Sequence, residues 1–211
     1  MKTALITASP KGINSASKCL LDMLKKQLEN MELEEFVWNR MSCSGDDMEK
    51  IGACDAIVFA FPLYIDSIPS HLLRCLIRLQ EYLSSIGAGT DVHVYAIVNN
   101  GFFDSKQDIP AIDVMKNWAV RAGISFGQGI AVGGGGMITG IKNLSDEHGP
   151  KKNIYMILGE LAKNIKSRKT AETKTVLPCI PEIAYKLIAQ TGWRNIAKKN
   201  GLKISDLGKK S

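Results

Sequence analysis

The chain of 211 residues lacks the cysteine and histidine patterns that mark several common functional sites. Its five cysteines are scattered, and no two of them form a C-x-x-C pair. The ligand spacing of zinc, iron–sulfur and dithiol redox sites is therefore missing. The three histidines are isolated as well. We predict no metal site.

Long apolar runs and nucleic-acid-binding motifs are also missing. No apolar run approaches the roughly 20 residues that a membrane helix needs, and the apolar start of the chain is too short for a signal peptide. The net charge is +6, and much of the excess lies between Arg194 and Lys210. No helix-turn-helix, zinc-finger or RNA-binding signature accompanies these charges. We expect a cytoplasmic protein with neither a membrane partner nor a nucleic-acid partner.

What the sequence does contain is an alternation of apolar strands and amphipathic helices. Strands are predicted at residues 2–8, 35–38, 55–61, 92–98 and 125–132. Helices are predicted at residues 15–30, 46–51, 69–85, 108–122 and 150–165. Five such units predict an α/β fold, a doubly wound five-stranded parallel sheet in the order 2-1-3-4-5 with helices on both faces. Residues 1–166 would form this domain, and residues 167–211 a helical C-terminal extension of it. Trp118, Met156 and Trp193 fall at helical core spacing and are interpreted as packing residues.

The loop after the first strand delivers small polar residues directly onto a helix N-terminus. Its candidate binding residues are Ser9, Lys11, Asn14, Ser15, Ala16 and Ser17. Unsatisfied N–H groups and the helix dipole at such a terminus attract a phosphate, and Asn14 or Ser15 is the natural N-cap. Neither G-x-x-x-x-G-K-[ST] nor G-x-G-x-x-G is present, which favours a single phosphate group. The alternative is a helix that is merely well capped.

The loop after the third strand combines apolar and aromatic residues. Its candidates are Pro62, Leu63, Tyr64 and Ile65, which offer a wall for a flat ring and backbone amides that can donate hydrogen bonds. The alternatives are an ordinary connection between a strand and a helix, and a Tyr64 ring that packs inward.

The loop after the fourth strand is rich in side-chain amides. Its candidates are Asn99, Asn100, Gly101 and Phe102. Asn and Gly tolerate left-handed backbone and let a ligand approach closely, although a simple turn is the alternative. Four glycines, Gly133–Gly136, follow the fifth strand without the Lys-Ser/Thr of a phosphate loop. We therefore assign them no ligand contacts and interpret them as a flexible or close-packed segment near the site.

These three loops meet at the switch point of the predicted strand order, where flavodoxin-like folds bind FMN. A phosphate loop, an apolar and aromatic loop and an amide-rich loop suit the phosphate, the ring face and the pyrimidine edge of FMN.

The same three segments resemble the NAD(P)H-dependent FMN reductase / flavodoxin-like oxidoreductase family. The matching motifs are Ser9-Pro10-Lys11-Gly12 through Ser17, Pro62-Leu63-Tyr64 with Ser67-Ile68-Pro69, and Asn99-Asn100-Gly101-Phe102. They span roughly the first half of the chain. Ala16 departs from the pattern, because the family commonly has a polar residue there, and this implies weaker binding of FMN.

The resemblance implies an FMN-dependent oxidoreductase that passes electrons from NADH or NADPH to a small-molecule acceptor of the quinone, azo or nitro type. It also implies a homodimer, a backbone donor near the flavin N5 at Tyr64 or Ile65, and polar groups from Asn99 to Phe102 at the pyrimidine edge. No catalytic side chain is assigned. Two alternatives stay open: a flavodoxin-type electron carrier, which the positive net charge disfavours, and a flavin-free binding or regulatory protein, which Ala16 favours.

Overall fold

The computed structural model describes residues 1–40, 43–87, 89 and 91–203 of the chain. The chain divides into two compact units, Met1–Pro178 and Cys179–Ser211. The predicted extension, residues 167–211, thus contributes its first part to the first unit. The basic residues Lys209 and Lys210 lie outside the described residues.

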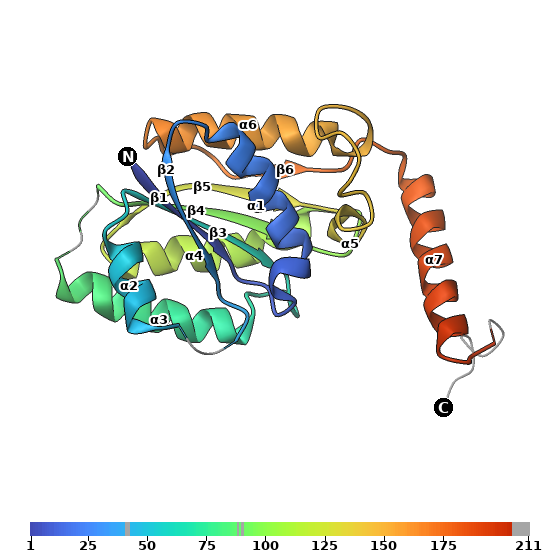
Figure 1. Cartoon of the computed structure of the whole chain (residues 1–211), viewed down its shortest axis with the longest axis horizontal. Coiled ribbons are helices and arrows are strands. Elements are labelled where there is room, and N and C mark those ends of the chain that lie inside the picture. Colours follow the sequence, from blue (N-terminus) through green and yellow to red (C-terminus); the bar gives the residue numbers. More distant parts are fainter. Residues whose placement is uncertain (41–42, 88, 90, 204–211) are drawn as a thin grey trace. The chain divides into compact units, whose positions relative to one another are not determined.

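The first unit is built on a parallel sheet with the strand order β2-β1-β3-β4-β5-β6 (Figure 1). Its strands are β1 (Lys2–Thr7), β2 (Glu32–Val37), β3 (Ala56–Pro62), β4 (His93–Asn99), β5 (Ser125–Val132) and β6 (Lys174–Val176). The predicted five-stranded order 2-1-3-4-5 is confirmed. The sixth strand was not predicted, because three residues with two polar side chains carry no readable strand pattern.

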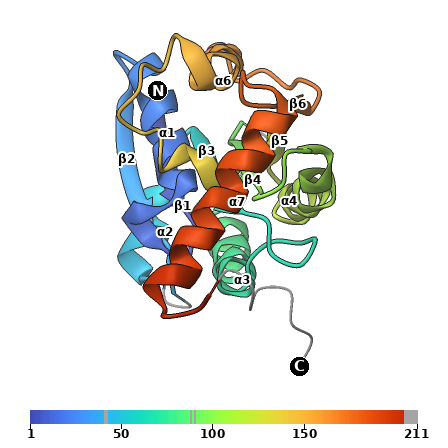
Figure 2. The same ribbon diagram turned by 90° about the vertical axis from the view of Figure 1, so that its right-hand side faces the viewer.

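Helices cover both faces of this sheet (Figures 1 and 2). One face carries α1 (Ala16–Gln27) and α6 (Lys152–Lys166), and the other carries α2 (Gly45–Gly52), α3 (Ser70–Ser85) and α4 (Ile109–Arg121). The strands between them are apolar on both faces, as buried parallel strands must be. In β3, for example, Val58 joins the core beneath α1, whereas Ile57 and Phe59 join the opposite core.

Short elements complete the first unit. Single turns of 3-10 helix occur at Gly12–Asn14, Lys106–Asp108 and Gly149–Lys151, and the four-residue helix α5 (Gly135–Ile138) follows β5 where the sequence predicted only a loop. Among the predicted packing residues, Trp118 is buried and its indole N–H donates to the Leu76 carbonyl at 2.9 Å. The prediction is wrong for Met156 and Trp193, which are 60% and 72% exposed.

The described part of the second unit consists mainly of α7 (Glu182–Lys199), which lies within the helical extension predicted for residues 167–211. Pro181 precedes the helix, in an extended conformation that suits a helix start. None of the described helices is both long enough and apolar enough to cross a membrane. Within the described ranges, no three His, Cys, Asp or Glu side chains gather as metal ligands.

Candidate functional site

The β1 loop, residues 8–15, ends in a capped helix. Ser15 is the N-cap of α1: its hydroxyl accepts from the Lys18 amide at 3.1 Å and donates to the Gly12 carbonyl at 2.6 Å. Gly12 has φ +55°, a left-handed conformation that glycine adopts without strain. The amides of Ala16 and Ser17, in the first turn of α1, have no hydrogen-bond partner among the described residues. This terminus therefore offers free donors to an anion.

Two of the three predicted hydroxyl donors are engaged within the protein. Ser17 Oγ donates to Asn99 Oδ1 at 2.8 Å in a buried contact that ties α1 to the end of β4. Ser15 serves as the N-cap, as described above. Ser9 is buried and accepts from the Lys11 amide at 3.4 Å. Backbone amides, the Ser9 hydroxyl and the exposed Lys11 are thus the groups available to a phosphate.

The β3 loop, residues 63–69, is a tight hairpin above the sheet. Tyr64 and Ser67 exchange two backbone hydrogen bonds of 2.9 and 3.1 Å, so Ile65 and Asp66 occupy the two central positions. Both have positive φ, +48° and +56°, as a two-residue turn between antiparallel segments requires. Tyr64 is 45% exposed, so its ring does not pack inward. The Leu63 amide donates to the Asn99 carbonyl at 2.8 Å and fixes this hairpin to the end of β4.

The β4 loop, residues 100–105, uses its side-chain amide to hold its own backbone. Asn100 Nδ2 donates to the Asp104 carbonyl at 2.9 Å and to Asp108 Oδ1 at 3.1 Å, and Asn100 Oδ1 accepts from the Phe102 amide at 2.8 Å. The side-chain amide is therefore occupied, and the loop presents mainly backbone groups to its surroundings.

The three loops enclose one cavity of about 230 Å³ at the carboxyl ends of β1, β3 and β4. It contains every predicted site residue except Ile65 and Phe102, whose side chains are 99% and 59% exposed. Its lining is Ser9, Lys11, Asn14, Ser15, Ala16, Ser17, Pro62, Leu63, Tyr64, Asn99, Asn100, Gly101, Gly135, Gly136 and Thr139. Gly135, Gly136 and Thr139 lie after β5, outside the three predicted loops, and no ligand contact was predicted for them.

The glycine segment, Gly133–Gly136, packs backbone to backbone against the β4 loop. Gly134 donates to the Phe102 carbonyl at 2.6 Å, and Gly135 donates to the Asn100 carbonyl at 2.7 Å. A Cβ atom on Gly133 would lie 2.2 Å from the Phe103 carbonyl oxygen, which no side chain tolerates. The glycines therefore permit close approach between two loops. The run of four glycines predicted a flexible or close-packed segment near the site, and the structure shows close packing; Gly135 and Gly136 line the cavity, although no ligand contact was assigned to them.

Asp108 contacts the β4 loop and the end of β5 from outside the cavity, and it is not among the predicted site residues. Its side chain is completely buried, and its two oxygens accept from Asn100 Nδ2 and from the Val132 amide, each at 3.1 Å. Burial raises the pKa of this carboxyl to about 7, against the opposing effect of the two hydrogen bonds. In the sequence the residue is only a carboxylate just before a helix.

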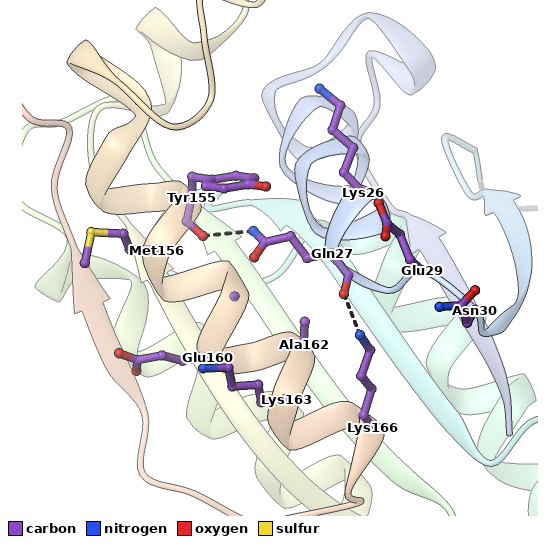
Figure 3. A pocket seen from close by; sticks show the side chains of 11 residues that line it. Lys26, Gln27, Glu29, Asn30, Tyr155, Met156, Glu160, Ala162, Lys163 and Lys166 are labelled. Carbon is purple, nitrogen blue, oxygen red and sulfur yellow. Dashed lines mark hydrogen bonds between the residues drawn. The ribbon is translucent and has the colours of Figure 1, made fainter.

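A larger cavity of about 620 Å³ lies beside the other end of α1, between that helix and α6 (Figure 3). Its lining is dominated by long charged side chains, namely Lys26, Glu29, Glu160, Lys163 and Lys166. Gln27 spans the helix pair: its Nε2 donates to the Tyr155 carbonyl, and its own carbonyl accepts from Lys166 Nζ, both at 2.9 Å. No strand end contributes to this lining. Ligand sites have fixed, convergent polar groups, and the smaller cavity meets that description better.

Comparison of the whole chain with known proteins gives structural matches only. No family model matches the sequence. No curated protein matches it either. A flavodoxin, WrbA-like protein from Agrobacterium tumefaciens superposes with a TM-score of 0.56 at 12% identity, over 80% of this chain and 99% of the other.

Two further solved structures are similar. A flavodoxin from Streptococcus pneumonia TIGR4 gives a TM-score of 0.54 at 12% identity, over 80% of this chain and 99% of that one. An NAD(P)H:quinone oxidoreductase from Methanothermobacter marburgensis gives a TM-score of 0.55 at 15% identity, over 79% of this chain and 96% of that one. At such identities the likeness establishes the architecture, and the chain has the flavodoxin-like fold that its strand order predicts.

Proposed function

We propose that this protein is an FMN-dependent NAD(P)H oxidoreductase that passes electrons from NADH or NADPH to a quinone-, azo- or nitro-type acceptor. The observation that carries the proposal is the convergence of the β1, β3 and β4 loops on one cavity at the β1/β3 switch point. Open α/β sheets bind ligands at such a point, and FMN occupies it in flavodoxin-like folds.

The phosphate end of the cavity fits the FMN phosphate. The free amides of Ala16 and Ser17 lie at the positive end of the α1 dipole, with Ser9 and Lys11 in the same lining. An alanine at position 16 removes no backbone donor, so the departure from the family pattern leaves this anion site usable. It removes only a possible side-chain hydrogen bond.

The opposite part of the cavity fits a flat ring with a polar edge. Pro62, Leu63 and Tyr64 supply an apolar and aromatic wall, and the half-exposed Tyr64 ring is free to stack on the flavin or on a substrate. The side-chain amide of Asn100 is engaged by Asp104 and Asp108. We therefore assign the pyrimidine edge chiefly to backbone groups of the β4 loop and the glycine segment.

Bound FMN would supply the hydride- and electron-transfer chemistry. The protein would hold and tune it. Of the two amides proposed as donors near N5, that of Tyr64 is used by Ser67, whereas that of Ile65 has no partner among the described residues. Ile65 is thus the better candidate. Backbone N–H groups at the pyrimidine edge would stabilise negative charge on the reduced ring, and no side chain is required as acid or base.

The test is an absorbance spectrum of the protein after incubation with FMN and desalting, followed by anaerobic addition of NADH or NADPH. We expect retained flavin bands that bleach rapidly with one nicotinamide. Bands that bleach only with dithionite would indicate a flavodoxin-type electron carrier. A colourless protein would refute the flavin proposal.

A further inference from the structure

Asp108 joins two loops of the site without lining the cavity. It lies in the 3-10 turn Lys106–Asp108 immediately before α4. One carboxylate oxygen accepts from the Asn100 side chain in the β4 loop, and the other accepts from the Val132 amide at the end of β5, each at 3.1 Å. A single buried side chain therefore connects the loop after β4 to the last residue of the neighbouring strand β5.

Each hydrogen-bond partner of Asp108 belongs to, or directly precedes, a wall of the cavity. Asn100 orders its own loop through the Asp104 carbonyl and the Phe102 amide, as described above. Val132 is the last residue of β5, directly before the glycine segment. The two walls then contact each other through the Gly134–Phe102 and Gly135–Asn100 hydrogen bonds. Asn100 and Gly101 of the first wall and Gly135 and Gly136 of the second line the cavity.

Joining two loops through a buried carboxylate lowers the stability of the protein. Asp108 forms no ion pair with any described residue; its hydrogen-bond partners are neutral N–H groups, and the nearby charge of Asp104 is of the same sign. Burying a carboxylate without a cation costs stability, and the two hydrogen bonds from neutral donors offset that cost only in part. Residues that are locally unfavourable for folding occur most often where a functional arrangement requires them.

We propose that Asp108 is a positioning residue for the ligand site: its carboxylate fixes the β4 loop and the glycine segment in one arrangement before the ligand arrives. Fixing the two walls in advance raises affinity, because the ligand does not have to order them. The inference rests on the proposed function in that the ligand used to test it is FMN.

The test compares Asp108→Asn with Asp104→Asn. The two substitutions are identical, but Asp104 is exposed, and its Oδ1 accepts from the Lys106 amide, a hydrogen bond that Asn can keep. Asn at position 108 retains one acceptor and turns an NH₂ group toward an N–H donor. Hydrogen exchange at residues 100–103 and 133–136 is measured without ligand, and the FMN dissociation constant is measured by fluorescence titration. We expect at least about 10-fold faster exchange and 10-fold weaker binding for Asp108→Asn alone.

A reciprocal double variant, Asn100→Asp with Asp108→Asn, tests whether the contact itself is responsible. Asn at 108 can accept from Val132 and donate to Asp at 100, which can still accept from Phe102 but loses the hydrogen bond to the Asp104 carbonyl. We expect slower exchange and tighter FMN binding than in Asn100→Asp alone, which lacks the same hydrogen bond to Asp104 and sets two carboxylates against each other. The same double variant serves if the single variant does not fold.

The outcomes separate this inference from the proposed function. Unchanged exchange in Asp108→Asn, or faster exchange with unchanged FMN affinity, would overturn the role of Asp108. A double variant whose exchange is as fast as that of Asn100→Asp alone would also overturn it. If the wild-type protein binds no FMN, the proposed function fails, whereas the exchange comparison still decides whether Asp108 fixes the two loops.

Discussion

The two ends of helix α1 border cavities of opposite construction. At its N-terminal end, the cavity of about 230 Å³ is walled by strand ends, turns and glycines, so its shape is set by backbone hydrogen bonds. At its C-terminal end, the cavity of about 620 Å³ is walled mainly by long charged side chains of two helices. Exposed ion pairs and hydrogen bonds hold such side chains weakly, whereas buried backbone hydrogen bonds are costly to break. For the ligand site that we propose, fixed backbone geometry and not volume is the feature that distinguishes the two cavities.

Adding one methyl group beside each cavity, at Gly133 and at Gly159, should give the largest difference in the free energy of unfolding. The Cβ of Gly133→Ala would lie 2.2 Å from the Phe103 carbonyl oxygen, so backbone would have to move. We expect a loss of about 3–5 kcal/mol in the free energy of unfolding, with loss of FMN retention. The Cβ of Gly159→Ala would lie 2.5 Å from Gln27 Oε1, the end of a flexible side chain. Because alanine also favours the helix, we expect a change within about 1 kcal/mol.

Urea unfolding at equilibrium measures both changes. Equal losses at the two glycines would show that side-chain contacts hold the larger cavity as firmly as backbone contacts hold the smaller one, and the contrast would be lost.

The pH dependence of stability should reveal the buried carboxyl group of Asp108, near the smaller cavity. The pKa of Asp108 is raised from 3.8 to about 7, so the folded state binds more protons than the unfolded state between these values. Stability therefore falls as pH rises through this window and is level above it. Relative to Asp108→Asn, wild type should lose roughly 3 kcal/mol between pH 5 and pH 8.

The matched control is Glu160→Gln, at the larger cavity. The Glu160 side chain is about half exposed and pairs with Lys174. Exposed ion pairs contribute little, so Glu160→Gln should change the free energy of unfolding by no more than about 0.5 kcal/mol. A flat difference for Asp108→Asn would contradict the buried, raised-pKa carboxylate.

The sequence was most informative where local pattern alone decides structure. Apolar runs predicted the five main strands, and their order brought three polar or aromatic loops to one edge of the sheet. Twelve of the fourteen candidate residues line the cavity, but pattern could not place the side chain of Ile65 or Phe102. What the sequence could not provide was contact between distant loops. The glycine segment matters because of Phe103, and Asp108 matters because of Asn100 and Val132. No spacing rule predicts such tertiary neighbours.

Removing the side chains that cap the two ends of α1 should give a smaller difference in stability. Ser15 is buried and caps the N-terminus, whereas the largely exposed Lys166 donates to the Gln27 carbonyl at the C-terminus. We expect Ser15→Ala to cost about 1 kcal/mol and to weaken FMN binding several-fold, because the amides of the first turn lose their alignment. Lys166→Met should cost no more than about 0.5 kcal/mol and leave FMN binding unchanged. Thermal unfolding and flavin fluorescence measure the two effects, and equal effects on FMN would contradict a ligand site at one end only.

The smallest expected effect has the opposite sign and concerns the β3 loop. Ile65 is a β-branched residue at φ +48° whose side chain is 99% exposed, so no packing offsets its backbone strain. Ile65→Gly should relieve that strain and, after the entropy that glycine loses on folding, raise stability by about 0.5 kcal/mol. The same substitution at Ile77, half-exposed within α3, should lower stability by about 1 kcal/mol, because glycine is unfavourable in a helix. A loss of stability at both positions would show that the Ile65 turn is unstrained. A gain at position 65 would mean that the protein keeps an unfavourable residue at the lip of the cavity, where the open face of the site would receive its substrate.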